Sequence, residues 1–166
     1  MHAFYHYVID KYPLRQKCHL FGFSRGGLYA FNFARFYPEY TASVYLDAPV
    51  LDLKSWPLAN SPEQAQMFAE FGLNKKTLAL YKDNPADNLE EYFRLHIPTL
   101  LIAGAKDELV SFSENAGKMI AFCKNNNLPL SYIVKPECGH HPHSLENVAP
   151  IVDFIKSNRS RENKNE

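Results

Sequence analysis

A serine between two glycines is the residue of this chain whose surroundings point most clearly to chemistry. Residues 22–26 read Gly-Phe-Ser-Arg-Gly, the pattern G-x-S-x-G, with the serine at Ser24. A short apolar strand is expected before it, over 17–22, and an apolar helix after it, over 25–36. A sharp strand-to-helix turn exposes the serine hydroxyl beside the first free N–H groups of the helix, and glycines let the backbone pass closely. The sequence predicts a nucleophile elbow; the alternative is a glycine-rich turn whose serine caps a helix.

A serine hydroxyl is a weak nucleophile, so it needs a base and an acid that orients the base. Asp107 follows an expected strand over 99–104, in the turn Gly-Ala-Lys-Asp. His140 follows Gly139 in the loop after an expected strand over 130–134. Catalytic loops of open α/β sheets lie past the carboxyl ends of the strands. The order Ser, Asp, His is the one that an elbow-type triad requires, and the backbone N–H of Arg25 is the expected oxyanion donor.

Alternatives to both partners stay open at this point. His141 is the second candidate for the base, and His143 is expected to orient the loop or to contact the substrate. Asp47, at the end of an expected strand over 41–46, is the second candidate for the acid and is otherwise expected to shape the pocket. Cys138 stands two residues before His140, but the elbow already presents a serine as nucleophile.

The histidine loop also contains the residue types of a metal site. Cys138, His140, His141 and His143 are all metal-ligand types. Their spacing on one short loop is too tight for a single tetrahedral set, and Pro142 stiffens the loop. We therefore expect no metal, and the chemistry requires no cofactor.

The order of these motifs resembles that of the α/β-hydrolase superfamily, in particular its serine esterase and prolyl-oligopeptidase-like branch. The motifs are, in chain order, the elbow, a strand followed by G-x-x-D and a strand followed by G-H. The resemblance runs from about Lys17 to about Ile155. It implies an α/β fold, a parallel sheet with flanking helices. It also implies that Ser24 is the nucleophile, Asp107 the acid and His140 the base.

The front of the chain departs from that family. A complete member has about eight strands, with the elbow after the fifth, and a loop near the front supplies a second oxyanion N–H. Here residues 1–12 resemble the helix before the elbow strand. We expect a fold without its N-terminal strands, through truncation or because they belong to a separate chain. The strand over 17–23 would then be an open apolar edge. The expected partners are a missing N-terminal half or a second copy of this chain.

Composition and charge exclude other classes of protein. The chain has 166 residues, 46% of them hydrophobic, enough for one domain with a sizeable core. Its formal net charge is zero, so neither nucleic acid nor a membrane is an expected partner. The start lacks the pattern of a signal peptide, which makes the cytoplasm the default expectation. The three cysteines are expected to be free thiols.

Alternating strands and helices predict a parallel sheet with right-handed crossovers. Further helices are expected over 2–11, 114–125 and 147–157. Residues 50–95 interrupt this alternation of strands and helices and predict a lid-like helical excursion, with helices near 62–71 and 74–82. Trp56 either lines the substrate pocket or packs the excursion onto the domain. The domain is expected to end at residue 158, followed by a polar tail over 159–166.

These observations together predict a serine hydrolase that cleaves a small carboxylic ester through an acyl-enzyme. Two alternatives remain. One is a serine peptidase of the prolyl-oligopeptidase type. The other is a non-catalytic hydrolase remnant or subunit.

Overall fold

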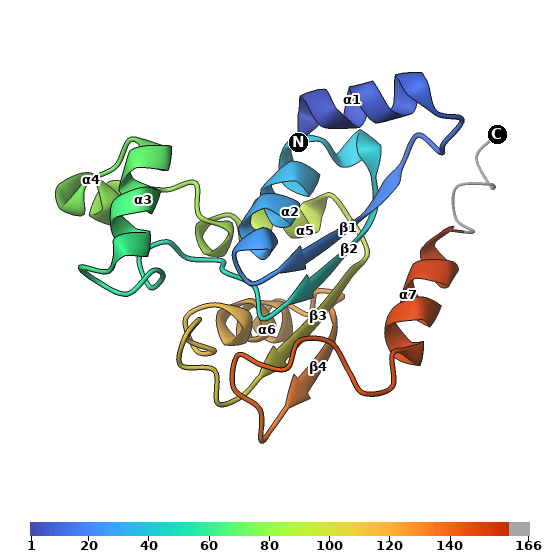
Figure 1. Cartoon of the computed structure of the whole chain (residues 1–166). Helices are drawn as coiled ribbons and strands as arrows, with labels where there is room; N and C mark the ends of the chain where they lie inside the picture. Colours follow the sequence, from blue (N-terminus) through green and yellow to red (C-terminus); the bar gives the residue numbers. More distant parts are fainter. Residues whose placement is uncertain (160–166) are drawn as a thin grey trace.

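A four-stranded parallel sheet organises the protein (Figure 1), as seen in a computed structural model that describes residues 1–159. Its strands are β1 (Cys18–Phe23), β2 (Thr41–Asp47), β3 (Thr99–Gly104) and β4 (Ser131–Lys135). They lie side by side in chain order, and every neighbouring pair is parallel. Each strand falls within one residue of its expected bounds. All four carboxyl ends therefore meet at one edge of the sheet.

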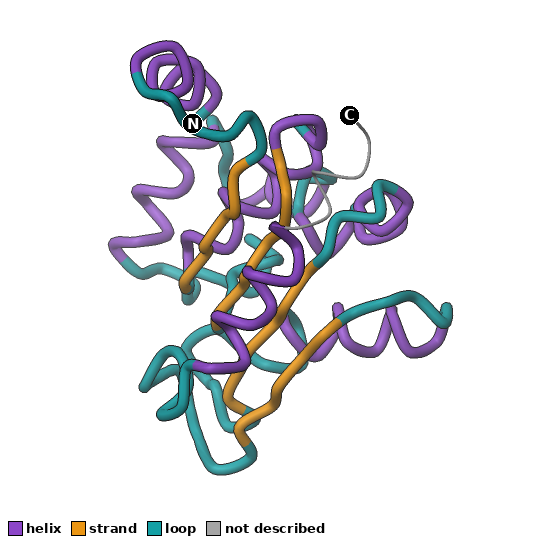
Figure 2. Tube along the Cα trace, turned by 90° about the vertical axis from the view of Figure 1, so that its right-hand side faces the viewer, coloured by secondary structure: helices purple, strands orange, loops and turns teal. Residues whose placement is uncertain are grey.

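Helices cover both faces of the sheet, as the expected α/β class requires. They are α1 (His2–Lys11), α2 (Arg25–Phe36), α5 (Leu89–Arg94), α6 (Ala116–Asn125) and α7 (Ala149–Arg159). The main hydrophobic core lies on one face, between the sheet and residues of α1, α2, α5 and α6. On the other face α7 crosses in front of the strands in Figure 2, and its Ile151 packs with Tyr45, Leu100 and Ile102. Strand β3 is buried at every position because both of its faces are covered.

Strand β1 is covered less completely than the others. Within residues 1–159 it pairs with β2 alone, so its other edge has no strand partner there. Helix α7 covers one face of the sheet at β2 and β3. On the same face of β1, Phe21 is 50% exposed and Phe23 is 41% exposed. An apolar strand edge next to exposed aromatic rings is a surface prone to association.

The expected excursion after β2 is present. It contains α3 (Pro62–Phe71) and α4 (Lys75–Leu80), which project away from the sheet in Figure 1. The chain also has two short 3-10 turns: η1 (Pro38–Tyr40) lies between α2 and β2, and η2 (Pro85–Asp87) follows α4. A second, smaller hydrophobic cluster ties the excursion to the domain; its buried members are Leu28, Val50, Leu53, Met67 and Val110. Helix α5 was not predicted, because its six residues are too few to show a helical period.

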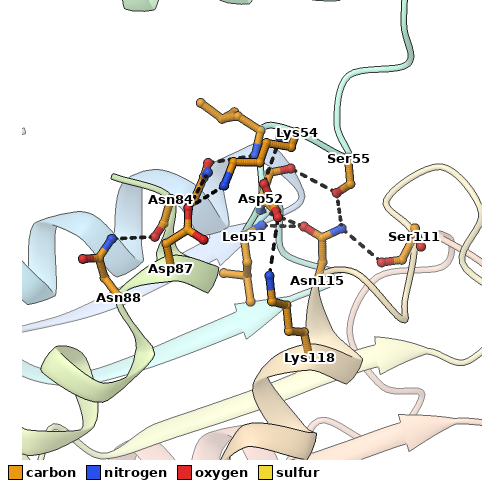
Figure 3. Close-up of polar contacts among 11 residues, drawn as sticks. Leu51, Asp52, Lys54, Ser55, Asn84, Asp87, Asn88, Ser111, Asn115 and Lys118 are labelled. Carbon is orange, nitrogen blue, oxygen red and sulfur yellow. Dashed lines mark hydrogen bonds and ion pairs between the residues drawn. The ribbon is translucent and has the colours of Figure 1, made fainter. Parts of the chain in front are cut away.

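Two buried asparagines fix the loop that leaves β2 (Figure 3). The side-chain oxygen of Asn115 accepts from the backbone N–H groups of Leu51 and Asp52, at 2.7 and 3.0 Å. The side-chain oxygen of Asn84 accepts from the N–H of Leu53 at 2.9 Å. Both amide groups also donate to further partners, so their buried polar atoms are satisfied. The start of the excursion is thereby pinned to the start of α6 and to η2.

Two further predictions can be compared with the structure. Cys18, Cys123 and Cys138 are free thiols. The tail expected over 159–166 differs at its first residue, because Arg159 closes α7, and residues 160–166 lie outside the described part of the chain. Among the described helices, none combines the length and apolar character needed to cross a membrane.

Candidate active site

Ser24 stands at the turn between β1 and α2, with a backbone that an ordinary residue rarely adopts. Its φ is 49° and its ψ is −122°. Three backbone hydrogen bonds of 2.9 Å hold it there: its N–H donates to the carbonyl of Asp47, and its carbonyl accepts from Gly27 and Val50. Strained backbone at a site persists where surrounding bonds over-determine it. The turn thus has the conformation expected of a nucleophile elbow.

Glycine is required at two positions of this turn, Gly22 and Gly27. Only Gly22 is one of the two glycines of the G-x-S-x-G pattern. A Cβ on Gly22 would lie 2.7 Å from the Cα of Gly27, too close for any side chain. A Cβ on Gly27 would overlap Pro49. Around Gly26, by contrast, nothing lies within 4 Å of the added atom. The expected clash at Gly26 is therefore wrong, and Gly27 has that role instead.

The structure brings Ser24, His140 and Asp107 together, although up to 116 residues separate them. The Ser24 Oγ lies 3.0 Å from Nε2 of His140, and Nδ1 of His140 lies 2.8 Å from Oδ2 of Asp107. The side chains of His140 and Asp107 are 8% and 2% exposed. The carboxylate can only accept, so Nδ1 carries the proton and Nε2 keeps a lone pair facing the serine hydroxyl.

The loops after β3 and β4 hold each other in place. The N–H of Lys106 donates to the carbonyl of Cys138 at 2.9 Å, and the N–H of Ala105 donates to that of Lys135 at 3.0 Å. The second oxygen of Asp107 accepts from the N–H of Val110 at 2.9 Å. Both carboxylate oxygens are thus engaged, and the acid has one orientation relative to the histidine.

Asp47 was the second candidate for the acid that pairs with the catalytic histidine, but in the structure it pairs with His143 and not with His140. Its Oδ1 lies 3.1 Å from Nδ1 of His143, and its Oδ2 accepts from the N–H of Ser144 at 2.6 Å and from the hydroxyl of Tyr45. The Asp47 side chain is 1% exposed. Burial, together with this neighbouring carboxylate, raises the pKa of Tyr45 above its ordinary value. Asp47 therefore lies beneath the loop of histidines and anchors it to β2. Sequence reasoning missed this pair, since nothing local to either residue signals it.

The remaining candidate residues lie around this centre. His141 is exposed, while its ring stands 5.0 Å from that of His140 and 4.8 Å from that of His143. Arg25 is the first residue of α2, where a helix offers its backbone N–H no internal acceptor, and its side chain is exposed. Trp56 packs against the second hydrophobic cluster, in the position expected of a residue that joins the excursion to the domain.

Comparison with known proteins gives a family and a fold. The family model of the prolyl oligopeptidase family matches residues 1–160. No match is found among curated proteins. A puromycin-hydrolysing peptidase of Mycobacterium tuberculosis superposes with a TM-score of 0.64 at 15% identity, over 96% of this chain and 23% of its own.

Two further solved structures have the same fold. Dipeptidyl peptidase 4 of Porphyromonas gingivalis gives a TM-score of 0.58 at 14% identity, over 86% of this chain and 19% of its own. A ferulic acid esterase gives 0.59 at 16% identity, over 95% of this chain and 53% of its own. The chain thus spans between about a fifth and about half of the length of these proteins. At such low identity the likeness concerns the α/β-hydrolase fold.

Proposed function

The chain belongs to the prolyl oligopeptidase family, and we propose on that premise that it is a serine hydrolase working through an acyl-enzyme at Ser24. The observation that carries the proposal is the continuous hydrogen-bonded line from Ser24 through His140 to Asp107, with distances of 3.0 and 2.8 Å. The alternative, a glycine-rich turn whose serine caps a helix, does not account for a histidine that lies beside the serine and pairs with a buried carboxylate. In the structure the Ser24 side chain makes no cap hydrogen bond to α2.

In the first half of the reaction the Ser24 oxygen attacks the substrate carbonyl carbon while Nε2 of His140 takes the hydroxyl proton. Asp107 holds the imidazole in the tautomer that accepts this proton and stabilises the imidazolium that forms. The carbonyl oxygen becomes an oxyanion, and its proposed donor is the backbone N–H of Arg25 at the positive end of α2.

In the second half His140 returns its proton to the leaving alcohol or amine as the carbon–leaving-group bond breaks. Ser24 is then esterified by the acyl group. A water molecule gives a proton to Nε2 of His140 and attacks the acyl carbon. The bond between that carbon and the Ser24 oxygen then breaks, and His140 returns the proton to this oxygen, which restores the free serine. No cofactor takes part in these steps.

A carboxylic ester is the leading substrate, because an ester is the least demanding acyl donor for this machinery. A peptide bond is the second candidate. It is favoured by the family, and two of the three solved structures above are named as peptidases. A peptide is the more demanding substrate, because an amine is a poorer leaving group than an alcohol and depends more strongly on protonation by His140.

A matched pair of substrates tests the proposal and separates its two forms. A p-nitrophenyl ester and a p-nitroanilide with the same acyl group differ only in the atom that leaves. An activated ester is cleaved faster than the matching anilide by either class of enzyme, so the informative result is whether the anilide is cleaved at all. We expect an esterase to hydrolyse the ester and to leave the anilide intact, and Ser24→Ala to abolish the ester hydrolysis. Equal turnover by the Ser24→Ala variant would contradict the proposal. Cleavage of the anilide that depends on Ser24 would assign the protein to the peptidases.

A further inference from the structure

Three histidine side chains meet next to Ser24, and acyl transfer uses only one of them. His140, His141 and His143 each offer a ring nitrogen, and these nitrogens all lie within 4.8 Å of one another. The ring centroids are 4.8 to 5.0 Å apart, and each pair of rings is close to perpendicular, at 77° to 78°. The rings are therefore grouped around a common point and not stacked in a row.

Two of these rings are each held by a buried carboxylate. Nδ1 of His140 faces Asp107, and Nδ1 of His143 faces Asp47 at 3.1 Å. In both pairs the bond occupies Nδ1, so Nε2 keeps the free lone pair. Histidine ligands of zinc are held in this way: the outer carboxylate fixes the ring and its tautomer and makes the other nitrogen more basic. The triad explains one such pair and leaves the other unexplained.

The spacing is close to what a metal ion requires. Zinc binds histidine nitrogens at about 2.0–2.1 Å, so nitrogens at two corners of its tetrahedron lie about 3.4 Å apart. Nitrogens that lie no more than 4.8 Å apart have to approach by about 1.4 Å at most. Of the three side chains His141 is the exposed one, and a rotation of it can bring its nitrogen closer to the other two. Three histidines leave the fourth position to water, a common arrangement for zinc.

We infer that His140, His141 and His143 bind Zn²⁺ or a similar divalent ion and that this ion inhibits the hydrolase. The inhibition rests on the proposed function, and the binding does not. Nε2 of His140 is the atom that lies 3.0 Å from Ser24 Oγ. One lone pair cannot bind zinc and also take the serine proton, so the occupied site lacks its base. The sequence argued against a metal because the candidate ligands lie close together on one short loop. It could not show that Asp47, at the end of β2, orients His143.

Calorimetric titration of the untagged protein with ZnCl₂ tests the binding. We expect one strongly bound ion per chain, lost in both His141→Ala and His143→Ala. Asp47→Asn should weaken it by about 10–100-fold, the usual effect of removing the outer carboxylate. His6→Ala is the matched control, because Nε2 of His6 lies 3.0 Å from Nε2 of His2 on α1 and this pair is an alternative ligand set. Binding that survives in the His141→Ala variant, or that is lost in His6→Ala, would overturn the inference.

The inhibition is measured separately, as the rate at which a fluorophosphonate probe labels Ser24. Zinc should slow labelling of the wild-type protein, EDTA should restore it, and the His141→Ala variant should be insensitive. Zinc that binds without slowing the labelling contradicts the inference, since His140 would not then be a ligand. If Ser24 is not labelled even without zinc, the proposed hydrolase function fails, while the calorimetry still decides whether the zinc site exists.

Discussion

Gly104, the last residue of β3, lies directly beneath the backbone of Gly139, which precedes His140. A Cβ on Gly104 would overlap the carbonyl oxygens of Gly139 and Cys138. These are backbone atoms of the loop that carries the candidate base, so they cannot turn aside as a side chain can. The path of this loop over the end of β3 depends on glycine at position 104.

We therefore expect Gly104→Ala to destabilise the protein and to displace His140 from Ser24. Overpacking of this kind costs about 1–3 kcal/mol in the free energy of unfolding. Urea unfolding measures that loss, and fluorophosphonate labelling measures the displacement. Gly26→Ala is the matched control for stability, because its Cβ would meet nothing within 4 Å. Unfolding of Gly104→Ala at the wild-type urea concentration would contradict this interpretation of the contact.

Replacing each loop histidine in turn tests the assignment of the base. His140→Ala should reduce kcat for the ester by several orders of magnitude, about as much as Ser24→Ala, because members of a triad act as a unit. His141→Ala, in metal-free buffer, should reduce it far less, since His141 contacts neither Ser24 nor Asp107 by hydrogen bonds. A dead His141→Ala variant with an active His140→Ala variant would move the base by one position.

How much of this site follows from the sequence depends on how local each signal is. Ser24, Asp107 and His140 each come soon after an apolar strand, and parallel strands bring such positions to one edge. The pairing of Asp47 with His143 was not predictable, because it depends on how the loop after β4 folds back across two strands. The same holds for Gly27, whose need for glycine comes from Pro49 on a different loop. Helix α5 was missed because its six residues are too few to show a helical period. It is held in place by the main core, which includes Leu89, Tyr92 and Phe93.

Alkaline pH should destabilise the fold through buried groups that resist losing their protons. Burial raises the pKa of Cys123 from 9.0 to about 11 and raises the pKa of Tyr45 and Tyr92 above their ordinary 10.0. Each group therefore contributes stability that is complete below its unfolded pKa and is lost as the pH rises toward its folded pKa.

The free energy of unfolding should thus begin to fall near pH 9 and fall more steeply above about pH 10, by at most about 1.4 kcal/mol per pH unit for each such group. Urea unfolding across pH 8 to pH 11 measures this slope. Tyr92→Phe should make the decline above pH 10 shallower, because one titrating group is removed. A stability that stays constant up to pH 11 would show that these groups titrate alike in the folded and unfolded states.

The open edge of β1 should make this chain associate. We propose that two copies pair through β1, which has no strand on its outer side within the described residues and carries the half-exposed Phe21. Sedimentation of residues 1–166 should reveal dimers or larger species, and Phe21→Lys should shift them toward monomer. Leu80→Lys is the control, because Leu80 is 76% exposed on α4, away from the edge. A monodisperse wild-type monomer would refute the proposed pairing.

The central claim is that Ser24 is an activated nucleophile, and covalent labelling tests it without knowledge of the substrate. A fluorophosphonate reacts with a serine whose proton is taken by a neighbouring base, and peptide mapping identifies the modified residue. In metal-free buffer we expect one adduct, on Ser24, that is absent from Ser24→Ala and strongly reduced in His140→Ala. No adduct on the folded wild-type protein, an adduct on another residue, or undiminished labelling of Ser24→Ala would contradict the claim.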